Sequence, residues 1–213
     1  MMTETCMREE LIAVCRRLDG AGLVAATDGN ISCRLGDDRI LITPSGARKG
    51  ELTPLDLVLV DLNNGSILAG QGRASSEIRM HFLVYRRRAD VRAVVHAHPP
   101  MLTAYTLAGM PFRADVLPEV WLGIGPVPTA PYATPTTEEL ASSISPLIEH
   151  HQAILLERHG SVTFGCNLKE ACMRLEKLEH AAHTLFYSCL LAGKPPKPLP
   201  KAALKQLAAL LAK

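Results

Sequence analysis

An apolar run at residues 91–98 ends on two histidines separated by one alanine, and Pro99 follows directly. In an extended strand, side chains two residues apart lie on the same face, so His96 and His98 are predicted to project side by side. Proline lacks the amide hydrogen that a strand ladder needs, so we expect the strand to end there. The sequence therefore predicts a strand that presents two imidazole rings at its end.

A third histidine, His159, closes another apolar run at residues 153–160, where Gly160 permits a sharp turn. Neutral imidazoles bind divalent metals, and three histidines at strand ends would leave one coordination position open, as in a catalytic site. These ligand types favour Zn²⁺, with Mn²⁺ or Co²⁺ as alternatives. Taken singly, each histidine also fits a hydrogen-bonded residue of the core.

The size and charge of the chain narrow the classes of protein to consider. Its 213 residues suffice for one well-buried core, and a formal net charge of +2 gives no reason to expect nucleic-acid binding. No apolar stretch approaches membrane-spanning length, and the first five residues are too polar and acidic for a secretory signal. We expect a cytoplasmic protein that does not insert into membranes. The six cysteines contain no Cys-x-x-Cys pair and are expected to be reduced thiols.

Turn signals divide the chain into short strands and amphipathic helices. Strands are predicted at residues 30–35, 39–43, 57–61, 66–68, 91–98 and 153–159, the first four mostly as hairpins. Helices are predicted at residues 7–18, 78–88, 100–109, 136–150 and 168–191, whereas residues 110–135 are rich in proline and glycine. Asn64 and Gly65 indicate a type I′ turn. Residues 1–192 are expected to form the main domain, and residues 193–213 a proline-rich tether followed by a short helix over 201–213.

Glu77 follows two serines at the predicted start of the helix at 78–88, with Ser75 as the expected N-cap. The hydroxyls of Ser75 and Ser76 and the exposed N–H groups of a helix start form a pocket for an anion. A phosphate bound there would lie beside Glu77. The structural alternative is that an acid in a first helical turn is favoured by the helix dipole whether or not it reacts.

Two loops offer similar anion-binding chemistry. Gly29 and Asn30 in one loop, and Ser45 and Gly46 in the other, follow apolar segments and combine glycine-exposed backbone donors with short polar side chains. Both loops also fit ordinary turns. A rival metal cluster of Glu176, Glu179, His180 and His183 lies along the helix at 168–191, although that spacing fits a partly buried or interface helix face better.

Taken together, these motifs resemble the class II aldolase/epimerase family typified by L-fuculose-1-phosphate aldolase. The quoted motifs are Gly29-Asn30, Thr43-Pro44-Ser45-Gly46, Ser75-Ser76-Glu77, His96-Ala97-His98 and His159-Gly160, in this order along the chain. The resemblance covers nearly the whole chain up to about Gly193. It implies a three-layer α/β/α domain around a mixed, mostly antiparallel sheet, assembled as a homotetramer with active sites between subunits.

The resemblance also implies roles for individual residues. The metal ligands would be His96, His98 and His159, the acid–base residue Glu77, and the phosphate-binding residues Gly29, Asn30, Ser45, Gly46, Ser75 and Ser76. The fuculose enzymes supply tyrosines from a neighbouring subunit and from the C-terminal tail, but residues 117–121 read Leu-Pro-Glu-Val-Trp and no tyrosine follows Tyr187. A different group must handle the aldehyde end of the substrate, and Glu119 is the candidate.

The activity implied is cleavage of a ketose 1-phosphate to dihydroxyacetone phosphate and an aldehyde. Loss of the tyrosines favours aldehydes that need little polar recognition, as from a 5-deoxy or 5-methylthio pentulose phosphate. Partial burial is expected to raise the pKa of Glu77, and the charge of a metal to oppose this shift. Three alternatives stay open: a 3-oxo-tetronate 4-phosphate decarboxylase, a ribulose-5-phosphate 4-epimerase-like enzyme, whose family members carry aspartate where Glu77 stands, and a non-catalytic adducin-like scaffold.

Overall fold

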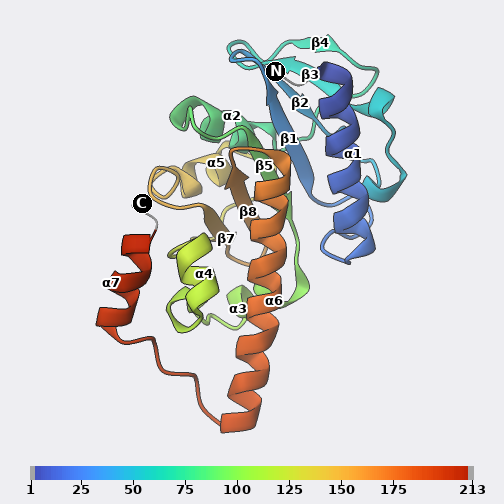
Figure 1. The fold of residues 1–213 in the computed structure, drawn as a ribbon. Coiled ribbons are helices and arrows are strands. Elements are labelled where there is room, and N and C mark those ends of the chain that lie inside the picture. The colour runs from blue at the N-terminus through green and yellow to red at the C-terminus, as the bar shows by residue number, and fades with distance from the viewer. Residues whose placement is uncertain (1–2, 211–213) are drawn as a thin grey trace.

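A single eight-stranded sheet forms the middle layer of the protein (Figure 1), whose computed structural model describes residues 3–210. Across the sheet the strands lie in the order β4 (Ile67–Ala69), β3 (Val58–Asp61), β2 (Arg39–Ile42), β1 (Asn30–Leu35), β5 (Ala93–Ala97), β8 (Gly160–Gly165), β7 (Ala153–Leu156) and β6 (Thr129–Ala130). Neighbouring strands pair antiparallel, except that β6 and β7 are parallel. The expected mixed, mostly antiparallel sheet is confirmed.

Helices cover both faces of the sheet, which confirms the three-layer α/β/α architecture (Figure 1). One face carries α1 (Glu4–Gly20), α3 (Pro100–Leu107), α4 (Pro118–Gly123) and α6 (Leu168–Ala192), and the other carries α2 (Ile78–Arg87) and α5 (Glu138–Ile144). Short 3₁₀ helices lie at Lys49–Glu51, Pro54–Asp56 and Ala114–Val116. Because side chains alternate along a strand, Ile40 and Ile42 pack towards α2 and α5, whereas Leu41 packs towards α1 and α6.

The start of α2 differs from the sequence-based prediction. The helix begins at Ile78, Glu77 occupies its N-cap position, and the hydroxyl of Ser75 accepts a hydrogen bond from the Glu77 N–H at 3.3 Å. Ser75 is therefore not the N-cap, because its hydroxyl closes a tight turn over residues 75–77, directly before the helix. This turn places the backbone of Glu77 at the junction between the serine loop and the helix.

Two other segments also differ from the prediction. Residues 110–135 contain α4 and β6, which their proline and glycine content concealed. The helix predicted at 136–150 is α5, which ends at Ile144. Ser145 keeps helical backbone geometry, but Pro146 has no N–H to continue the helical hydrogen bonds. The remaining helices and the strands of the first half lie within a few residues of their predicted positions.

The C-terminal segment lies against the main body. Helix α6 ends at Gly193 with left-handed backbone geometry, and α7 (Lys201–Leu210) then packs beside α4, where the Leu199 N–H donates to the Asp115 carbonyl at 2.8 Å. The last three residues of the helix predicted over 201–213 lie outside the described residues. Among the helices within residues 3–210, none has the length and apolarity needed to cross a membrane.

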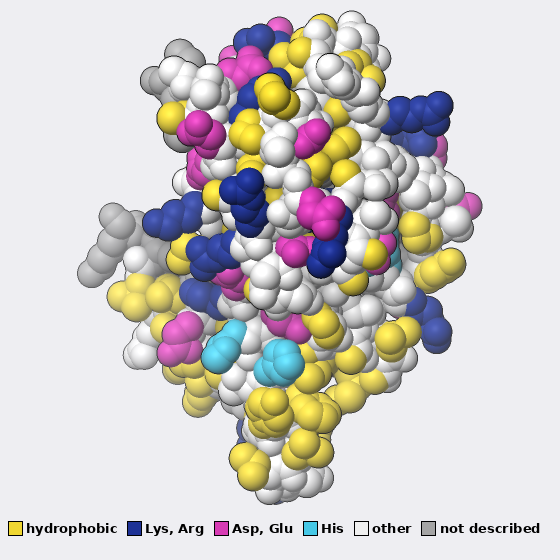
Figure 2. Space-filling view, turned by 90° about the vertical axis from the view of Figure 1, so that its right-hand side faces the viewer, with side chains coloured by type: hydrophobic (Ala, Val, Ile, Leu, Met, Phe, Trp, Pro, Cys, Tyr) yellow, Lys and Arg dark blue, Asp and Glu magenta, His cyan; other side chains and the backbone are white. Residues whose placement is uncertain are grey.

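Hydrophobic side chains gather where the end of α6 extends beyond the sheet (Figure 2). The large apolar residues exposed on this part of the helix are Phe186, Tyr187, Leu190 and Leu191. Contiguous exposed apolar surface of this kind is typical of a contact with another protein surface.

Candidate metal centre and acid–base site

Three histidine rings converge at one end of the central strands of the sheet. His96 lies in β5 between Asn30 of β1 and Val162 of β8, His98 follows the end of β5, and His159 lies in the turn between β7 and β8. The ring centroids are 4.8–4.9 Å apart in all three pairs, and one nitrogen from each ring lies within 4.8 Å of the others. The sequence-predicted set is therefore brought together in space.

Close backbone packing brings His159 to the other two rings. A Cβ atom on Gly160 would lie 2.4 Å from the Ala97 carbonyl oxygen and 2.9 Å from a ring carbon of His98. The sharp turn expected at Gly160 instead depends on Arg158, whose φ is +58° and whose N–H donates to the Thr106 hydroxyl at 3.1 Å. Gly160 is required for the close approach of β8 to β5, and Arg158 for the change of direction.

The hydrogen bonds of His96 leave its inner nitrogen free to bind a cation. Its Nδ1 donates to the Ser161 carbonyl at 2.9 Å, so in the neutral ring Nε2 carries a lone pair. That nitrogen faces His98 Nε2 at 3.1 Å and Glu77 Oε2 at 3.2 Å. Three ligand-type atoms therefore lie close together, and a backbone carbonyl behind a metal-bound histidine is the usual supporting contact.

The other two histidines are held in the neutral form that a metal ligand needs. Burial, followed by the charge of His96, lowers the pKa of His98 to about 3 and that of His159 to about 4. Both rings are therefore neutral near pH 7, as ligation requires. The Nδ1 atom of His98 lies 3.5 Å from Asp28 Oδ2, and the buried Nδ1 of His159 has no hydrogen-bond partner. The three residues fit a divalent metal.

Glu77 lies beside the histidines with 8% of its surface exposed. Its Oε2 accepts a hydrogen bond from Asn30 Nδ2 at 2.8 Å, whereas its buried Oε1 has no hydrogen-bond partner and lies 3.5 Å from His159 Nε2. Burial acts to raise the pKa of Glu77, as expected, but the hydrogen bond and charge of His96, with Asn30 and His159, outweigh it and lower the pKa. The expected upward effect of burial is therefore present, but the neighbouring side chains decide the direction of the shift in this structure.

A cavity of about 440 Å³ opens in front of these groups. The predicted residues that line it are Gly29, Asn30, Ser45, Gly46, Ser75, Ser76, Glu77, His98 and His159, while His96 is fully buried behind Glu77. The two serine loops are joined by backbone bonds from Ser45 N to Arg73 O at 2.9 Å and from Ser75 N to Thr43 O at 3.2 Å. Short hydroxyls and glycine backbone therefore surround one end of the cavity, which suits a phosphate.

Lys49 lies behind the same loops and was not singled out from the sequence. It is buried, and its Nζ donates to the carbonyls of Thr27 at 2.8 Å and Ala47 at 2.7 Å, which ties the two glycine loops together. Burial lowers the pKa of Lys49. Lys49 lies in a loop segment without helical or strand periodicity, so the sequence does not indicate that its side chain points inward.

Two of the other candidate groups lie away from the cavity. Glu119 is exposed in the first turn of α4 and does not line the cavity of its own chain. On α6, Glu179 accepts hydrogen bonds from the N–H groups of Met101 and Leu102 at the start of α3, and His183 Nε2 lies 3.3 Å from it. Within residues 3–210, the only group of three ligand-type side chains close enough to hold a metal is His96, His98 and His159.

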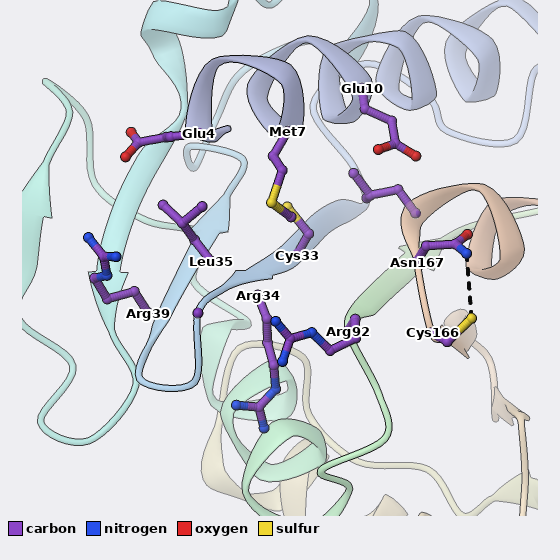
Figure 3. A pocket seen from close by; sticks show the side chains of 12 residues that line it. Glu4, Met7, Glu10, Cys33, Arg34, Leu35, Arg39, Arg92, Cys166 and Asn167 are labelled. Atoms are coloured by element: carbon purple, nitrogen blue, oxygen red, sulfur yellow. Dashed lines mark hydrogen bonds between the residues drawn. The ribbon is translucent and has the colours of Figure 1, made fainter. Parts of the chain in front are cut away.

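A second hollow of about 440 Å³ lies between α1, the hairpin of β1 and β2, and the start of α6 (Figure 3). It contains none of the predicted site residues. The Arg34 guanidinium there is held by the backbone carbonyls of Val91, Asp37 and Tyr85, and burial raises the pKa of the Cys33 thiol to about 12. Arg34 is thus already bonded to the backbone, and the buried Cys33 thiol stays protonated at neutral pH. In the part of the chain that the structure describes, only the three histidines converge closely enough to hold a metal, so this hollow does not rival the histidine site.

The sheet order, the three-histidine group and the serine- and glycine-lined cavity define a class II aldolase-type α/β domain. The chain belongs to the family described as the Class II Aldolase and Adducin N-terminal domain, whose model matches residues 9–186. The resemblance inferred from the motifs is thereby confirmed.

Named relatives match nearly full length. The chain is 34% identical over 94% of its length to 5-deoxy-D-ribulose 1-phosphate aldolase of Bacillus thuringiensis serovar kurstaki, and it covers 93% of that protein. It is 34% identical over 85% of its length to 3-oxo-tetronate 4-phosphate decarboxylase of Cupriavidus necator, of which it covers 84%. A solved structure of L-fuculose 1-phosphate aldolase superimposes with a TM-score of 0.88 at 30% identity, over 100% of this chain and 99% of that one. These comparisons support an enzyme of the lyase type that acts on a sugar phosphate.

Proposed function

We propose that the protein is a metal-dependent aldolase that cleaves a ketose 1-phosphate to dihydroxyacetone phosphate and an aldehyde. The observation that carries this proposal is the buried Glu77 carboxylate, whose Oε1 lacks a hydrogen-bond partner and lies beside three converging imidazoles at the end of an anion-type cavity. An adducin-like scaffold would have no need of such an arrangement. Zn²⁺ is the metal that three histidines favour.

The residues divide the reaction between them. A divalent cation held by the three histidines would act as a Lewis acid and stabilise negative charge on the substrate's carbonyl and hydroxyl oxygens. The loops at Gly29, Ser45 and Ser75 hold the phosphate, which fixes the position of the ketose carbons. Cleavage of the C3–C4 bond leaves an electron pair on C3. Glu77, after it takes up a proton from solvent in the cavity, delivers that proton to C3 to complete dihydroxyacetone phosphate. In the reverse direction Glu77 removes the same proton.

The aldehyde end requires a group outside this cavity. The C4 hydroxyl must lose its proton when the bond breaks, and we propose Glu119 for this step. Because Glu119 does not line the cavity of its own chain, this role requires a neighbouring copy. A homotetramer with active sites between subunits, supported by the apolar surface at the end of α6, would provide that copy.

We propose a 5-deoxy or 5-methylthio pentulose 1-phosphate as substrate, on the lack of the polar tyrosines and on the similarity to a relative named 5-methylthioribulose-1-phosphate/5-deoxyribulose-1-phosphate aldolase. The test is a coupled assay for dihydroxyacetone phosphate with 5-deoxyribulose, 5-methylthioribulose and fuculose 1-phosphates. We expect turnover of the first two to exceed that of the third. A strong preference for the fuculose compound would refute the assignment of the aldehyde.

Glu77→Gln is the control for the acid–base role. The amide keeps an oxygen that accepts from Asn30 but cannot transfer the proton, so we expect kcat to fall by about two to four orders of magnitude. Metal content should be retained. Turnover close to that of the unmodified enzyme would remove Glu77 from the mechanism.

A decarboxylase is the second candidate, because relatives named 3-oxo-tetronate 4-phosphate decarboxylase match at 32–34% identity, as closely as the aldolases do. Release of carbon dioxide from such an acid, with no dihydroxyacetone phosphate formed from any ketose 1-phosphate, would favour this reaction over the aldol cleavage.

A further inference from the structure

Behind Glu77, a row of buried polar side chains runs from the cavity into the core. Asn30 and Ser32 lie two residues apart on β1, and His81 and Tyr85 lie four residues apart on α2. Both spacings keep the side chains on one face and advance by about 6–7 Å, so the two pairs interdigitate between strand and helix. The exposed fractions of these four residues are between 0% and 3%.

Four hydrogen bonds link these side chains to the carboxylate in an unbroken series. Tyr85 Oη lies 2.8 Å from Ser32 Oγ, which lies 2.6 Å from His81 Nδ1. His81 Nε2 lies 2.6 Å from Asn30 Oδ1, and Asn30 Nδ2 lies 2.8 Å from Glu77 Oε2. Asn30 and His81 each use one atom towards the core and another towards Glu77, whereas Ser32 contacts both of its neighbours through Oγ.

The chemistry of the end group fixes the direction of every bond. An ionised carboxylate only accepts, so the Asn30 amide nitrogen must face Glu77 and its oxygen must face His81. His81 therefore donates from Nε2 and accepts at Nδ1 from the Ser32 hydroxyl, whose oxygen accepts from Tyr85. Burial lowers the pKa of His81 to about 3, so the ring is neutral and one tautomer satisfies both neighbours.

The orientation of the Asn30 amide depends on this series. A rotation of the amide by 180° would turn its oxygen towards the Glu77 carboxylate and its N–H groups towards His81. We propose that His81 is a positioning residue: its Nε2–H holds the Asn30 amide so that Nδ2 keeps Glu77 in place beside the histidine cluster, and Ser32 and Tyr85 select the tautomer that makes this possible. The inference rests on the proposed acid–base role of Glu77.

The first test needs no substrate. Imidazole ¹⁵N spectra of the whole protein, with the His81 signals assigned by their loss in His81→Gln, report which ring nitrogen carries the proton at pH 7. We expect a proton on Nε2 and none on Nδ1. A proton on Nδ1 or a doubly protonated ring would overturn the proposal.

The second test compares two amide substitutions. In His81→Gln the amide nitrogen reaches the place of Nε2 and can still donate to Asn30, whereas in His81→Asn it reaches only the place of Nδ1. With whichever substrate the protein turns over, we expect His81→Asn to lower kcat by on the order of tenfold to a hundredfold, as for loss of a bond that supports a charged group. KM should change less than about twofold, and His81→Gln should recover most of the rate.

A double-mutant cycle separates positioning from general damage. If His81 acts through Asn30, adding His81→Asn to Asn30→Ala should lower kcat by less than about twofold more, whereas independent effects would multiply. Multiplying effects, or equal losses in the Gln and Asn variants, would refute the proposal. If His81→Asn does not fold, the milder Tyr85→Phe replaces it in the same cycle.

Failure of this inference is distinguishable from failure of the proposed function. An active wild type and an inactive Glu77→Gln variant, combined with a fully active His81→Asn variant, would overturn only the role of His81. If no ketose phosphate is cleaved, the aldolase proposal fails, and the spectrum of His81 still decides whether the hydrogen bonds run as described.

Discussion

Gly160 is the position where one added methyl group should disturb the metal centre most directly. In Gly160→Ala the new Cβ would lie 2.4 Å from the Ala97 carbonyl oxygen and 2.9 Å from His98 Cδ2, so either β8 must move from β5 or the His98 ring must move. Overpacking of this kind costs about 1–3 kcal/mol. A shift of β8 would lower the free energy of unfolding, whereas a shift of the His98 ring would weaken metal binding.

The melting temperature and the Zn²⁺ affinity distinguish these two outcomes. If β8 moves, the melting temperature of the metal-free protein should fall by roughly 2–4 °C for each kcal/mol. If the His98 ring moves, Zn²⁺ affinity measured against a chromophoric chelator should fall about tenfold for each 1.4 kcal/mol, and so up to about a hundredfold. Gly20→Ala is the matched control, because apart from the backbone of its own helix and its chain neighbours no atom lies within 4 Å of the position that its added methyl group would take. A Gly160→Ala protein with wild-type melting temperature and wild-type Zn²⁺ affinity would refute the steric argument.

Three further predictions concern buried groups and the metal. The pKa of His81 is lowered from 6.5 to about 3, so the unfolded protein binds more protons than the folded protein below pH 6.5. The free energy of unfolding, measured by urea titration, should therefore fall as the pH is lowered from 6.5 to 4. This fall should be less steep in His81→Gln. Lys49→Met removes the donor from two loop carbonyls and should lower that free energy by about 1–3 kcal/mol and weaken binding of inorganic phosphate, and an unchanged phosphate affinity would contradict the loop-tying role. Treatment with a chelator should abolish turnover and Zn²⁺ should restore it, unless the metal-stripped protein proves fully active.

The site was predictable from sequence where a local pattern fixes geometry. Alternation along β5 places His96 and His98 near each other, and the serine pair before Glu77 marks the start of α2. His159 could be named as a candidate because it ends an apolar run, and the family resemblance implied its role as a metal ligand. The antiparallel pairing of β5 with β8, which brings it to the other two rings, is not visible in local periodicity. Residues whose role depends on contacts far along the chain, such as Lys49 and His81, carried no signal.

Local rules also failed where another side chain competed for the backbone. Asn64 and Gly65 indicated a type I′ turn, but only Gly65 has a positive φ, because the Asp61 carboxylate accepts the N–H groups of Asn63 and Asn64 and sets the turn itself. The hairpin between β3 and β4 forms as expected, although by a different turn. In the proline-rich segment, Pro118 starts α4 because proline suits the first position of a helix.

The site formed by the three histidines, Glu77 and Asn30 combines residues 30, 77, 96, 98 and 159. No short fragment of the chain therefore contains it. A ligand that recognises only this assembled arrangement is bound by the folded state alone. At a free concentration one hundred times its dissociation constant, such a ligand would raise the free energy of unfolding by about 2.7 kcal/mol. With the metal proposed above as that ligand, its supply in the surroundings would influence how long the folded polypeptide persists.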